Sequence, residues 1–381
     1  MKILFINRML GIAWGGGENY DYNLASGLRS LGHQVTFLTG CRKGDKPPEI
    51  GMETLSVETP YLRHYMYRFG GKVPLVPGAV AETDLHLFGA AVMRRLSRMA
   101  RAFDVAQVLA LPRLARKLAR RGWRVAMRFP GPPAWFQSPL LRRLALGDRM
   151  PMFSHGDAVG YFRDRLGIPV TEVLPGVNGD LYRPLAGEER ALIRRQIGFG
   201  PDDFVLATVG RLVPGKGHAF LLDAIGGIQD RSRLRLLVAG DGPLRGSLEA
   251  RSEALGLGRT VHFAGQQERE SVARLLAASD AFCLCSDYEN YSNAVLEAMA
   301  TGLPVLATRV GGFPLQVEAG VNGFLVDPGD QVSFRERVAE LAREPELTSR
   351  LGEGARRFAA RMSWQSSAEK VTRIYEQLLA A

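Results

Sequence analysis

The fold prediction rests on the stretch Ser286-Asp-Tyr-Glu-Asn-Tyr-Ser-Asn-Ala-Val-Leu-Glu297, which continues as Ala298-Met-Ala-Thr-Gly-Leu-Pro-Val-Leu-Ala-Thr-Arg-Val-Gly-Gly312. Directly before it, the short apolar run 280–285 is typical of a buried strand. Ser292 or Asn293 can cap a helix, because their side-chain oxygens accept hydrogen bonds from its free N–H groups. The helix formers that follow end at Gly302, and another apolar run comes next. The stretch therefore predicts a strand, a loop, a helix and a second strand.

Two carboxylates bracket the start of this helix. Glu289 lies in the loop before it, and Glu297 lies about one turn into it. A helix N-terminus that follows a strand favours anions, because free N–H groups and the positive end of the helix dipole coincide there. Carboxylates beside it can accept hydrogen bonds from sugar hydroxyls while the helix end holds a phosphate. The alternative is a capped amphipathic helix with two solvated acids, and the spacing alone does not decide between them.

The composition is that of a globular protein. The chain has 381 residues, of which 46% are hydrophobic and 23% charged, which is enough for two cores. No run approaches the roughly 20 apolar residues that span a bilayer, and the apolar start 1–8 is too short for a signal peptide. Cys41, Cys283 and Cys285 show no metal-ligand spacing. We expect buried, reduced thiols in a cytoplasmic protein.

The positive charge is unevenly distributed. The net charge is +10, yet residues 1–184 hold 26 basic and 14 acidic residues, and the remainder holds 23 basic and 25 acidic ones. Much of the excess lies between Arg94 and Arg149, with Leu and Met interleaved. It is either a solvated Arg-rich surface or a face attracted to anionic lipid or a phosphorylated acceptor. Nucleic acid is a weaker interpretation, because no recognition signature accompanies the charge.

The N-terminal half begins with a strand, a glycine loop, a helix and a second strand. Gly15, Gly16 and Gly17 let the backbone approach a ligand at the start of a helix predicted from Glu18. The loop lacks the spaced G-x-G-x-x-G pattern, so a dinucleotide site is not predicted. In all, strands are expected at 2–7, 35–39, 53–57, 105–109, 124–129, 150–154 and 170–174, with helices at 18–31, 85–99, 113–121 and 159–166. We expect 42–80 to be largely irregular.

The turn-rich segment 175–184 is the predicted domain boundary. A second α/β series follows it, with strands at 204–209, 234–239 and 261–264 and helices at 218–225, 244–254 and 272–278. A last helix begins near Ser363. The chain is thus predicted to form two α/β domains, each a parallel sheet with crossover helices.

Polar loops follow three strands of the second series, at 211–216, 241–243 and 289–293. Ligands of parallel sheets bind at the carboxyl ends of the strands. Arg211 offers a planar fork and Lys216 a point charge, both of which suit a diphosphate. Beside the helix N-terminus and the two carboxylates, they predict a site for a nucleoside diphosphate.

These residues resemble the donor domain of family 4 glycosyltransferases of GT-B architecture, the retaining group 1 type. The matching motifs span about 200–327 and are Val209-Gly-Arg-Leu-Val-Pro-Gly-Lys-Gly217, Ala239-Gly-Asp-Gly-Pro243, Glu289 to Glu297 as the E-x7-E motif, Gly302-Leu-Pro-Val305 and Gly311-Gly312. The looser N-terminal matches are Gly15-Gly-Gly-Glu18, Leu31-Gly-His33 and Leu174-Pro-Gly-Val-Asn-Gly179.

The resemblance implies two Rossmann-like domains with an interdomain cleft: an acceptor-side domain over 1–182, a donor domain over 183–362, and a helix over 363–381 that crosses back to the first domain. It implies retaining transfer of a hexose from a nucleotide sugar, UDP-sugar favoured over GDP-sugar, to a glycan or lipid-linked acceptor, with no metal or other cofactor. The expected location is the cytoplasm, with peripheral contact at the inner face of an anionic membrane.

The resemblance also assigns roles to individual residues. The implied catalytic residues are Glu289, Arg211 and Lys216, and the implied donor-binding residues are Gly16, Gly17, Gly242, Gln266, Ser292, Asn293, Ala294 and Glu297. Base contacts are expected from 265–268.

The sequence departs from the family pattern at several positions. Asn290 stands where a Gly is usual, and Ser292 stands for a Gly or Pro. No histidine occurs between His86 and His155, although the family often carries one at the ends of two N-terminal strands. Arg128 and His155 are the candidates for the acceptor side. The alternatives are therefore an epimerase or phosphorylase of the same fold, or a non-catalytic partner that binds nucleotide sugars.

Overall fold

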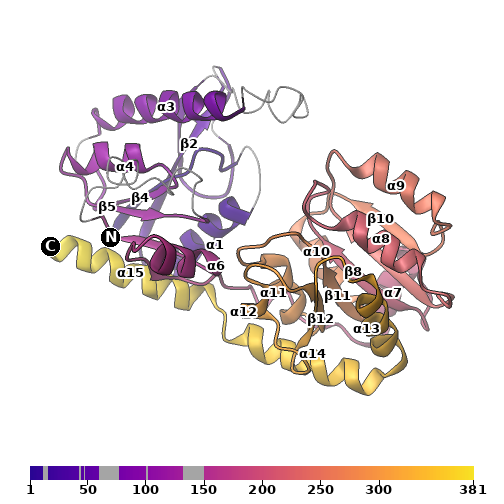
Figure 1. The fold of residues 1–381 in the computed structure, drawn as a ribbon. Coiled ribbons are helices and arrows are strands. Elements are labelled where there is room, and N and C mark those ends of the chain that lie inside the picture. The colour runs from indigo at the N-terminus through magenta and orange to yellow at the C-terminus, as the bar shows by residue number, and fades with distance from the viewer. Residues whose placement is uncertain (12–15, 43, 47, 60–76, 100–101, 132–149) are drawn as a thin grey trace. The chain divides into compact units, whose positions relative to one another are not determined.

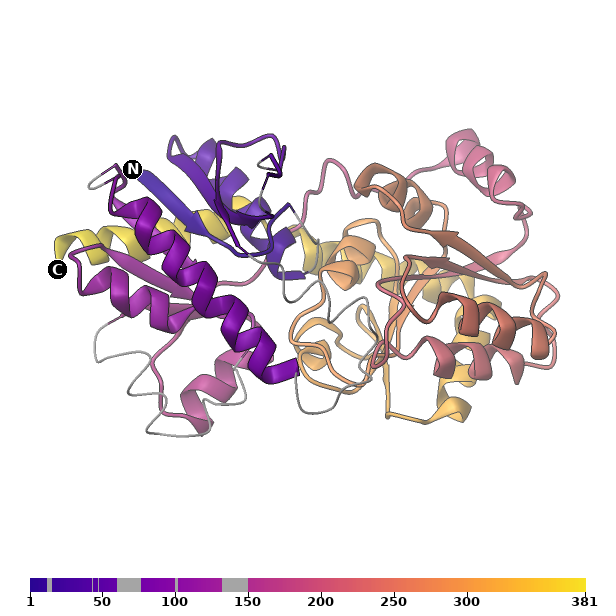
Figure 2. The ribbon, with the colours of Figure 1, turned by 90° about the horizontal axis from the view of Figure 1, so that it is seen from above.

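The computed structural model describes residues 1–11, 16–42, 44–46, 48–59, 77–99, 102–131 and 150–381. The chain divides into two compact units, each with its own sheet (Figures 1 and 2). Unit 1 comprises Met1–Pro175 and Trp364–Ala381, and unit 2 comprises Gly176–Ser363. The chain passes from unit 1 into unit 2 after Pro175, at the start of the turn-rich segment 175–184 that was predicted as the domain boundary.

Unit 1 contains a parallel sheet whose described strands follow the order β3-β2-β1-β4-β5-β6-β7. The strands are β1 (Lys2–Ile6), β2 (Gln34–Cys41), β3 (Thr54–Glu58), β4 (Val105–Leu109), β5 (Val125–Arg128), β6 (Met152–Ser154) and β7 (Thr171–Glu172). Successive side chains of a strand point to opposite faces, so Ile3 and Phe5 enter one core and Leu4 and Ile6 the other. Helices cover both faces, as a doubly wound fold requires.

The helices of unit 1 are α1 (Gly16–Ser30), α3 (Pro77–Leu96), α4 (Pro112–Ala119), α6 (Asp157–Gly160), the π-helical turn η2 (Tyr161–Arg165) and α15 (Trp364–Ala380). α1 and α15 share one core, and α3, α4 and α6 share the other. α15, at the yellow end of the chain in Figure 1, packs closely on α1. A Cβ at Gly27 would lie 2.7 Å from the Trp364 carbonyl oxygen, so the close approach of these helices requires a glycine.

Unit 2 contains a parallel sheet in the order β10-β9-β8-β11-β12-β13. The strands are β8 (Phe204–Val209), β9 (Leu234–Ala239), β10 (Val261–Gly265), β11 (Ala281–Leu284), β12 (Val305–Thr308) and β13 (Gly323–Val326). The helices are α7 (Gly187–Gln196), α8 (His218–Gly226), α9 (Arg245–Ala254), α10 (Arg269–Ala277), α11 (Asn293–Ala300), α12 (Phe313–Gln316), α13 (Gln331–Arg343) and α14 (Pro345–Ala360). α10, α11 and α14 cover one face of this sheet, and α8, α9 and α13 the other.

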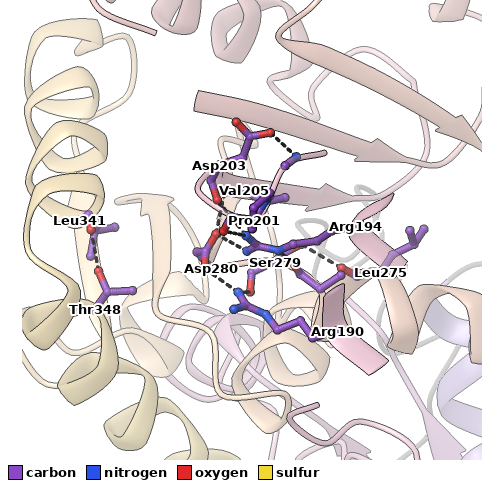
Figure 3. Close-up of polar contacts among 12 residues, drawn as sticks. Arg190, Arg194, Pro201, Asp203, Val205, Leu275, Ser279, Asp280, Leu341 and Thr348 are labelled. Atoms are coloured by element: carbon purple, nitrogen blue, oxygen red, sulfur yellow. Dashed lines mark hydrogen bonds and ion pairs between the residues drawn. The ribbon is translucent and has the colours of Figure 1, made fainter. Parts of the chain in front are cut away.

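α7 is fastened to this sheet by two arginines (Figure 3). Arg194 Nη2 donates to Asp280 Oδ2 at 2.6 Å, and Arg190 Nη2 donates to Asp280 Oδ1 at 2.5 Å. The backbone N–H of Val205 donates to the same carboxylate at 2.7 Å. Arg194 is buried and also donates to the carbonyl oxygens of 201, 203 and 278. Asp280 therefore joins α7 to the beginnings of β8 and β11.

Several predicted elements differ in extent from the observed ones. α1 begins at Gly16 rather than at Glu18, so its first turn includes two of the glycines that were predicted to form a loop. α3 begins at Pro77 rather than near residue 85, so the irregular segment predicted for 42–80 ends earlier. α10 begins at Arg269 rather than 272. α7, α12, β13, α13 and α14 were not predicted at all. Gly15 and residues 60–76 lie outside the described residues.

The three cysteines are free and buried, as expected. Burial raises the pKa of the Cys283 and Cys285 thiols. No helix in the described part of the chain has the length and apolar character needed to cross a membrane.

Candidate active site

The strand order of unit 2 reverses between β8 and β11, which are hydrogen-bonded neighbours. In open α/β sheets, ligands bind at the carboxyl ends of the strands where the order reverses. The loop after β8 carries Arg211 and Lys216, and the loop after β11 carries Glu289. The topology therefore brings together the three residues predicted to be catalytic.

Lys216 and Glu289 form an ion pair across this switch point. The Lys216 side chain is 26% exposed and the Glu289 side chain 15%, so both remain within reach of a ligand. The Ser286 hydroxyl also donates to Glu289 Oε1, at 3.3 Å. In the free protein, the ammonium and the carboxylate are each other's counter-ions.

Arg211 is exposed, and its guanidinium has no ion pair among the described residues. Its backbone is held by His218, the first residue of α8, whose Nε2 lies 3.2 Å from the Arg211 carbonyl oxygen. Burial lowers the pKa of His218, and the Lys216 charge lowers it further, although the hydrogen bond to Arg211 raises it. His218 is therefore neutral at pH 7 and donates its Nε2–H to this carbonyl oxygen, a contact that no sequence motif indicates.

The backbone of Glu289 is fixed by the glycines that follow β12. The Gly312 N–H donates to the Glu289 carbonyl oxygen at 2.7 Å. A Cβ at Gly311 would lie 2.1 Å from that oxygen, and one at Gly312 would lie 1.8 Å from the Asn290 carbonyl oxygen. The Gly-Gly pair of the motif is therefore a packing requirement for the loop that presents Glu289.

The N-terminus of α11 is capped by Ser292, as one of the two predicted alternatives requires. Ser292 Oγ accepts from the Val295 N–H at 3.3 Å. Gln316, buried on α12, exchanges two hydrogen bonds with the Ser292 backbone, at 2.8 and 2.9 Å. The N–H groups of Asn293 and Ala294 have no acceptor within the described ranges, so they remain available for an anion.

Glu297 lies in the middle of α11 and is half-buried. Its carboxylate accepts a hydrogen bond from the Tyr182 hydroxyl and faces the positive charge of Arg269. Burial raises the pKa of Glu297 to about 7, although Arg269 and Tyr182 oppose that shift. A carboxylate with vacant lone pairs therefore lies about one turn beyond the free N–H groups.

Gly242 and Gln266 lie at the ends of the neighbouring strands. A Cβ at Gly242 would lie 2.5 Å from the Leu212 carbonyl oxygen, so this glycine lets the loops after β8 and β9 pack together. The Leu212 N–H donates to the Asp241 carbonyl oxygen at 2.9 Å, which joins the same two loops. Gln266 is exposed after β10. Their predicted contacts with a donor remain predictions.

In unit 1, Gly16 and Gly17 form the first turn of α1. Arg128, at the carboxyl end of β5, donates to the Gly17 carbonyl oxygen through Nη2 at 2.8 Å. Its Nε donates to Asp21 Oδ1 at 2.7 Å. Asp21 also accepts from Asn7 at 2.9 Å and from Gln107 at 3.3 Å. Arg128 is thus held in a buried polar network, and its predicted contact with an acceptor remains a prediction.

His155 lies beside this network. Its ring stacks on that of Tyr20, with centroids 4.9 Å apart, and the Arg128 guanidinium covers the same tyrosine at 4.3 Å. Burial, and then the charge of Arg128, lower the pKa of His155 to about 3. The imidazole is therefore neutral at physiological pH and a very weak base.

Unit 2 is thus a doubly wound α/β unit with cationic, acidic and helix N-terminal groups at its switch point. Residues 189–358 match the sequence model of the glycosyl transferases group 1. This match lies within unit 2, and the resemblance drawn from the motifs of that unit is confirmed.

A curated relative gives a partial match. The D-inositol 3-phosphate glycosyltransferase of Corynebacterium jeikeium is 33% identical over 214 residues, which are 54% of this chain and 51% of the relative. The chain thus spans about half the length of the curated relatives it matches.

Solved structures match over nearly the whole chain. Sucrose-phosphate synthase from Thermosynechococcus elongatus superposes with a TM-score of 0.82 at 20% identity, covering 100% of this chain and 99% of that one. HepE from Anabaena, solved with UDP and glucose, gives 0.77 at 19% identity, with 99% of each chain covered. The predicted GT-B fold class of two α/β units is therefore confirmed.

Proposed function

We propose that the protein is a retaining glycosyltransferase that moves a hexose from a nucleoside diphosphate sugar to a glycan or lipid-linked acceptor, without a metal ion. The set of groups at the switch point of unit 2 carries the proposal: the Lys216–Glu289 pair, the open N–H groups of α11, and Glu297 one turn further on. A UDP-sugar is favoured over a GDP-sugar, and the UDP complexes of HepE support that preference by similarity.

The ion pair suggests how donor binding prepares the site. A diphosphate carries more charge than a carboxylate, so Lys216 exchanges Glu289 for the phosphates when the donor binds. Glu289 then accepts hydrogen bonds from hexose hydroxyls. Arg211 and the N–H groups of Asn293 and Ala294 complete the phosphate contacts. These fixed charges and dipoles stabilise the negative charge that grows on the leaving diphosphate, and this supplies most of the catalysis.

The reaction breaks the bond between the anomeric carbon and the β-phosphate oxygen and forms one to the acceptor hydroxyl oxygen. The acceptor proton passes to the departing β-phosphate. This route suits the chain because His155, with its lowered pKa, is too weak a base to take that proton.

Calorimetric titration with UDP, GDP and ADP, followed by hydrolysis assays with the matching nucleotide sugars, tests the proposal. Lys216→Met should abolish nucleotide binding, and Glu289→Gln should abolish hydrolysis while nucleotide binding persists. Asp327→Asn, which breaks an exposed pair with Arg309, is the matched control and should behave like wild type. Wild-type protein that binds none of the nucleotides overturns the proposal.

The same assays separate the alternatives. Conversion of the donor sugar to an isomer without any acceptor would indicate an epimerase, and release of a sugar phosphate in the presence of inorganic phosphate a phosphorylase. Nucleotide-sugar binding without turnover on any acceptor would indicate a binding partner.

We also propose that unit 1 contacts anionic membrane lipid through a basic face on α3, α4 and the turns that follow these two helices. Its members are all exposed: Arg94, Arg95, Arg98, Arg113, Lys117, Arg120, Arg121 and Arg124. α3 and α4 are neighbours, and Arg113 Nη1 lies 3.0 Å from the His86 imidazole of α3. Each cation near an anionic surface contributes about 1 kcal/mol of attraction.

A further inference from the structure

Tyr182 lies on the segment 176–184, through which the chain enters unit 2. Its side chain is 2% exposed and belongs to the core that also contains Ala298 and Met299 of α11. Its hydroxyl hydrogen-bonds to the Glu297 carboxylate and to Arg269. A Cβ on Gly302, just after α11, would lie 3.4 Å from Pro184 Cγ, so this segment follows α11 from Glu297 to its C-terminal end.

Glu297 is placed to accept hydroxyl groups under the proposed function, on which this inference rests. An ionised carboxylate has about four acceptor positions, and Tyr182 occupies one of them. Burial works against the ionised form, whereas a donated hydrogen bond and a nearby cation favour it. Tyr182 and Arg269 supply these two effects.

We propose that Tyr182 and Arg269 are positioning residues, which hold the Glu297 carboxylate charged and oriented for the two vicinal hydroxyls of a ribose. The site then selects ribonucleotides over 2′-deoxyribonucleotides, because the analogue leaves one acceptor of a half-buried carboxylate without a donor.

The arrangement also makes nucleotide affinity depend on pH. Only ionised Glu297 accepts from both hydroxyls, and burial raises the pKa of this group to about 7. Two groups face the carboxylate: Tyr182 from the entering segment and Arg269 from α10. Arg356, from the packed helix α14, lies instead against Gly302 at the far end of α11. Affinity should therefore fall about tenfold between pH 8 and pH 6.

The test is to measure nucleotide affinity by calorimetric titration over about pH 5.5 to 8.5. UDP is the ligand, or GDP or ADP if one of these binds better. In Tyr182→Phe, the midpoint of the pH dependence should move to higher pH, and affinity at pH 7 should fall several-fold. The preference of wild type for UDP over 2′-deoxy-UDP, expected to be at least about tenfold, should shrink. Tyr161→Phe, a half-buried tyrosine of unit 1, is the control and should change neither value.

Two further variants keep the outcome interpretable. Glu297→Gln removes the titrating carboxyl group. Any pH dependence of nucleotide affinity that remains in this variant therefore belongs to the β-phosphate of the nucleotide. Arg269→Gln should move the midpoint in the same direction as Tyr182→Phe, and it serves if that variant does not fold. Infrared difference spectra of wild type against Glu297→Gln report the protonated carboxyl without any nucleotide.

This inference alone is overturned if both Tyr182→Phe and Arg269→Gln leave the midpoint of the pH dependence and the preference for UDP over 2′-deoxy-UDP unchanged. A purely structural tyrosine would give that result, because its loss would lower stability without moving either quantity. A wild-type protein that binds no nucleotide overturns the proposed function as well.

Discussion

The ion pair of Asp21 with Arg128 is almost completely buried in unit 1, so breaking it should change stability by a large amount. Arg128 is 0% exposed and Asp21 is 1% exposed. Asp21→Asn leaves the guanidinium buried without its counter-ion and turns an amide donor toward Asn7 and Gln107, which are donors themselves. Removing one partner of a buried pair costs about 3–5 kcal/mol. For a unit of this size, the melting temperature should fall by roughly 10 °C.

Differential scanning calorimetry on wild type, Asp21→Asn, Arg128→Met and the double variant measures this effect. The double variant should be less destabilised than the sum of the single ones, because it leaves no unpaired charge. Asp327→Asn removes the same chemical group from a pair that is 54% and 74% exposed, and should cost less than about 1 kcal/mol. A loss below about 1 kcal/mol in Asp21→Asn would refute the reasoning.

Three more predictions follow from the geometry. Gly312→Ala should reduce nucleotide-sugar hydrolysis at least about tenfold, since its Cβ would lie 1.8 Å from the Asn290 carbonyl oxygen and displace the Glu289 loop; Gly246→Ala, with open space at its Cβ, should leave the rate unchanged. Glu297→Gln should raise the melting temperature above that of wild type at pH 8 but not at pH 4. The folded pKa of about 7 exceeds the ordinary 4.5, so the cost of the buried charge appears only as pH rises through that interval. Equal differences at both pH values would contradict the burial of this carboxyl. Replacing four cations of the basic face with Gln should weaken sedimentation with anionic vesicles by roughly a hundredfold or more, whereas neutral vesicles and a control variant on unit 2 should show no change. The four replaced residues are Arg113, Lys117, Arg120 and Arg121, and the four of the control are Arg343, Arg350, Arg357 and Arg361, all exposed.

Except for β13, the described strands of both sheets could be predicted from the sequence, because each is a short apolar run that ends at a glycine or a polar turn. β4, β8 and β9 have the predicted bounds. α3 was predicted to begin too late, because Pro77 and Gly78 resemble a loop. Pro is favourable in the first turn of a helix, and Asp84 of this helix pairs with Arg8, 76 positions away in the chain. Such a partner leaves no local sequence signal.

The candidate site shows the same difference between features that follow from a local sequence pattern and contacts between residues far apart in the chain. Lys216 and Glu289 could be placed together because each lies directly after a buried strand, and the strands of a parallel sheet end at one edge. Tyr182, Gln316 and His218 could not be predicted. Gln316 contacts Ser292 24 positions away, and the partner of Tyr182 lies on another element. His218 follows the motif directly, but its role depends on the turn made by Gly217, which has a positive φ of 72°.

The residue at the end of β5 bears on the reaction that this chain can support. A family histidine is often expected there, and Arg128 stands in its place with its charge balanced by Asp21. An arginine cannot accept a proton, and His155 nearby is neutral with a pKa lowered to about 3. Neither side chain can serve as the general base at neutral pH. Under the proposed function, the chemistry therefore depends on the donor side, where cations and helix N–H groups stabilise a leaving phosphate that can itself take the acceptor proton. It follows that changes at Lys216 should cost far more activity than changes at His155, and comparison of the two variants' turnover rates decides the point.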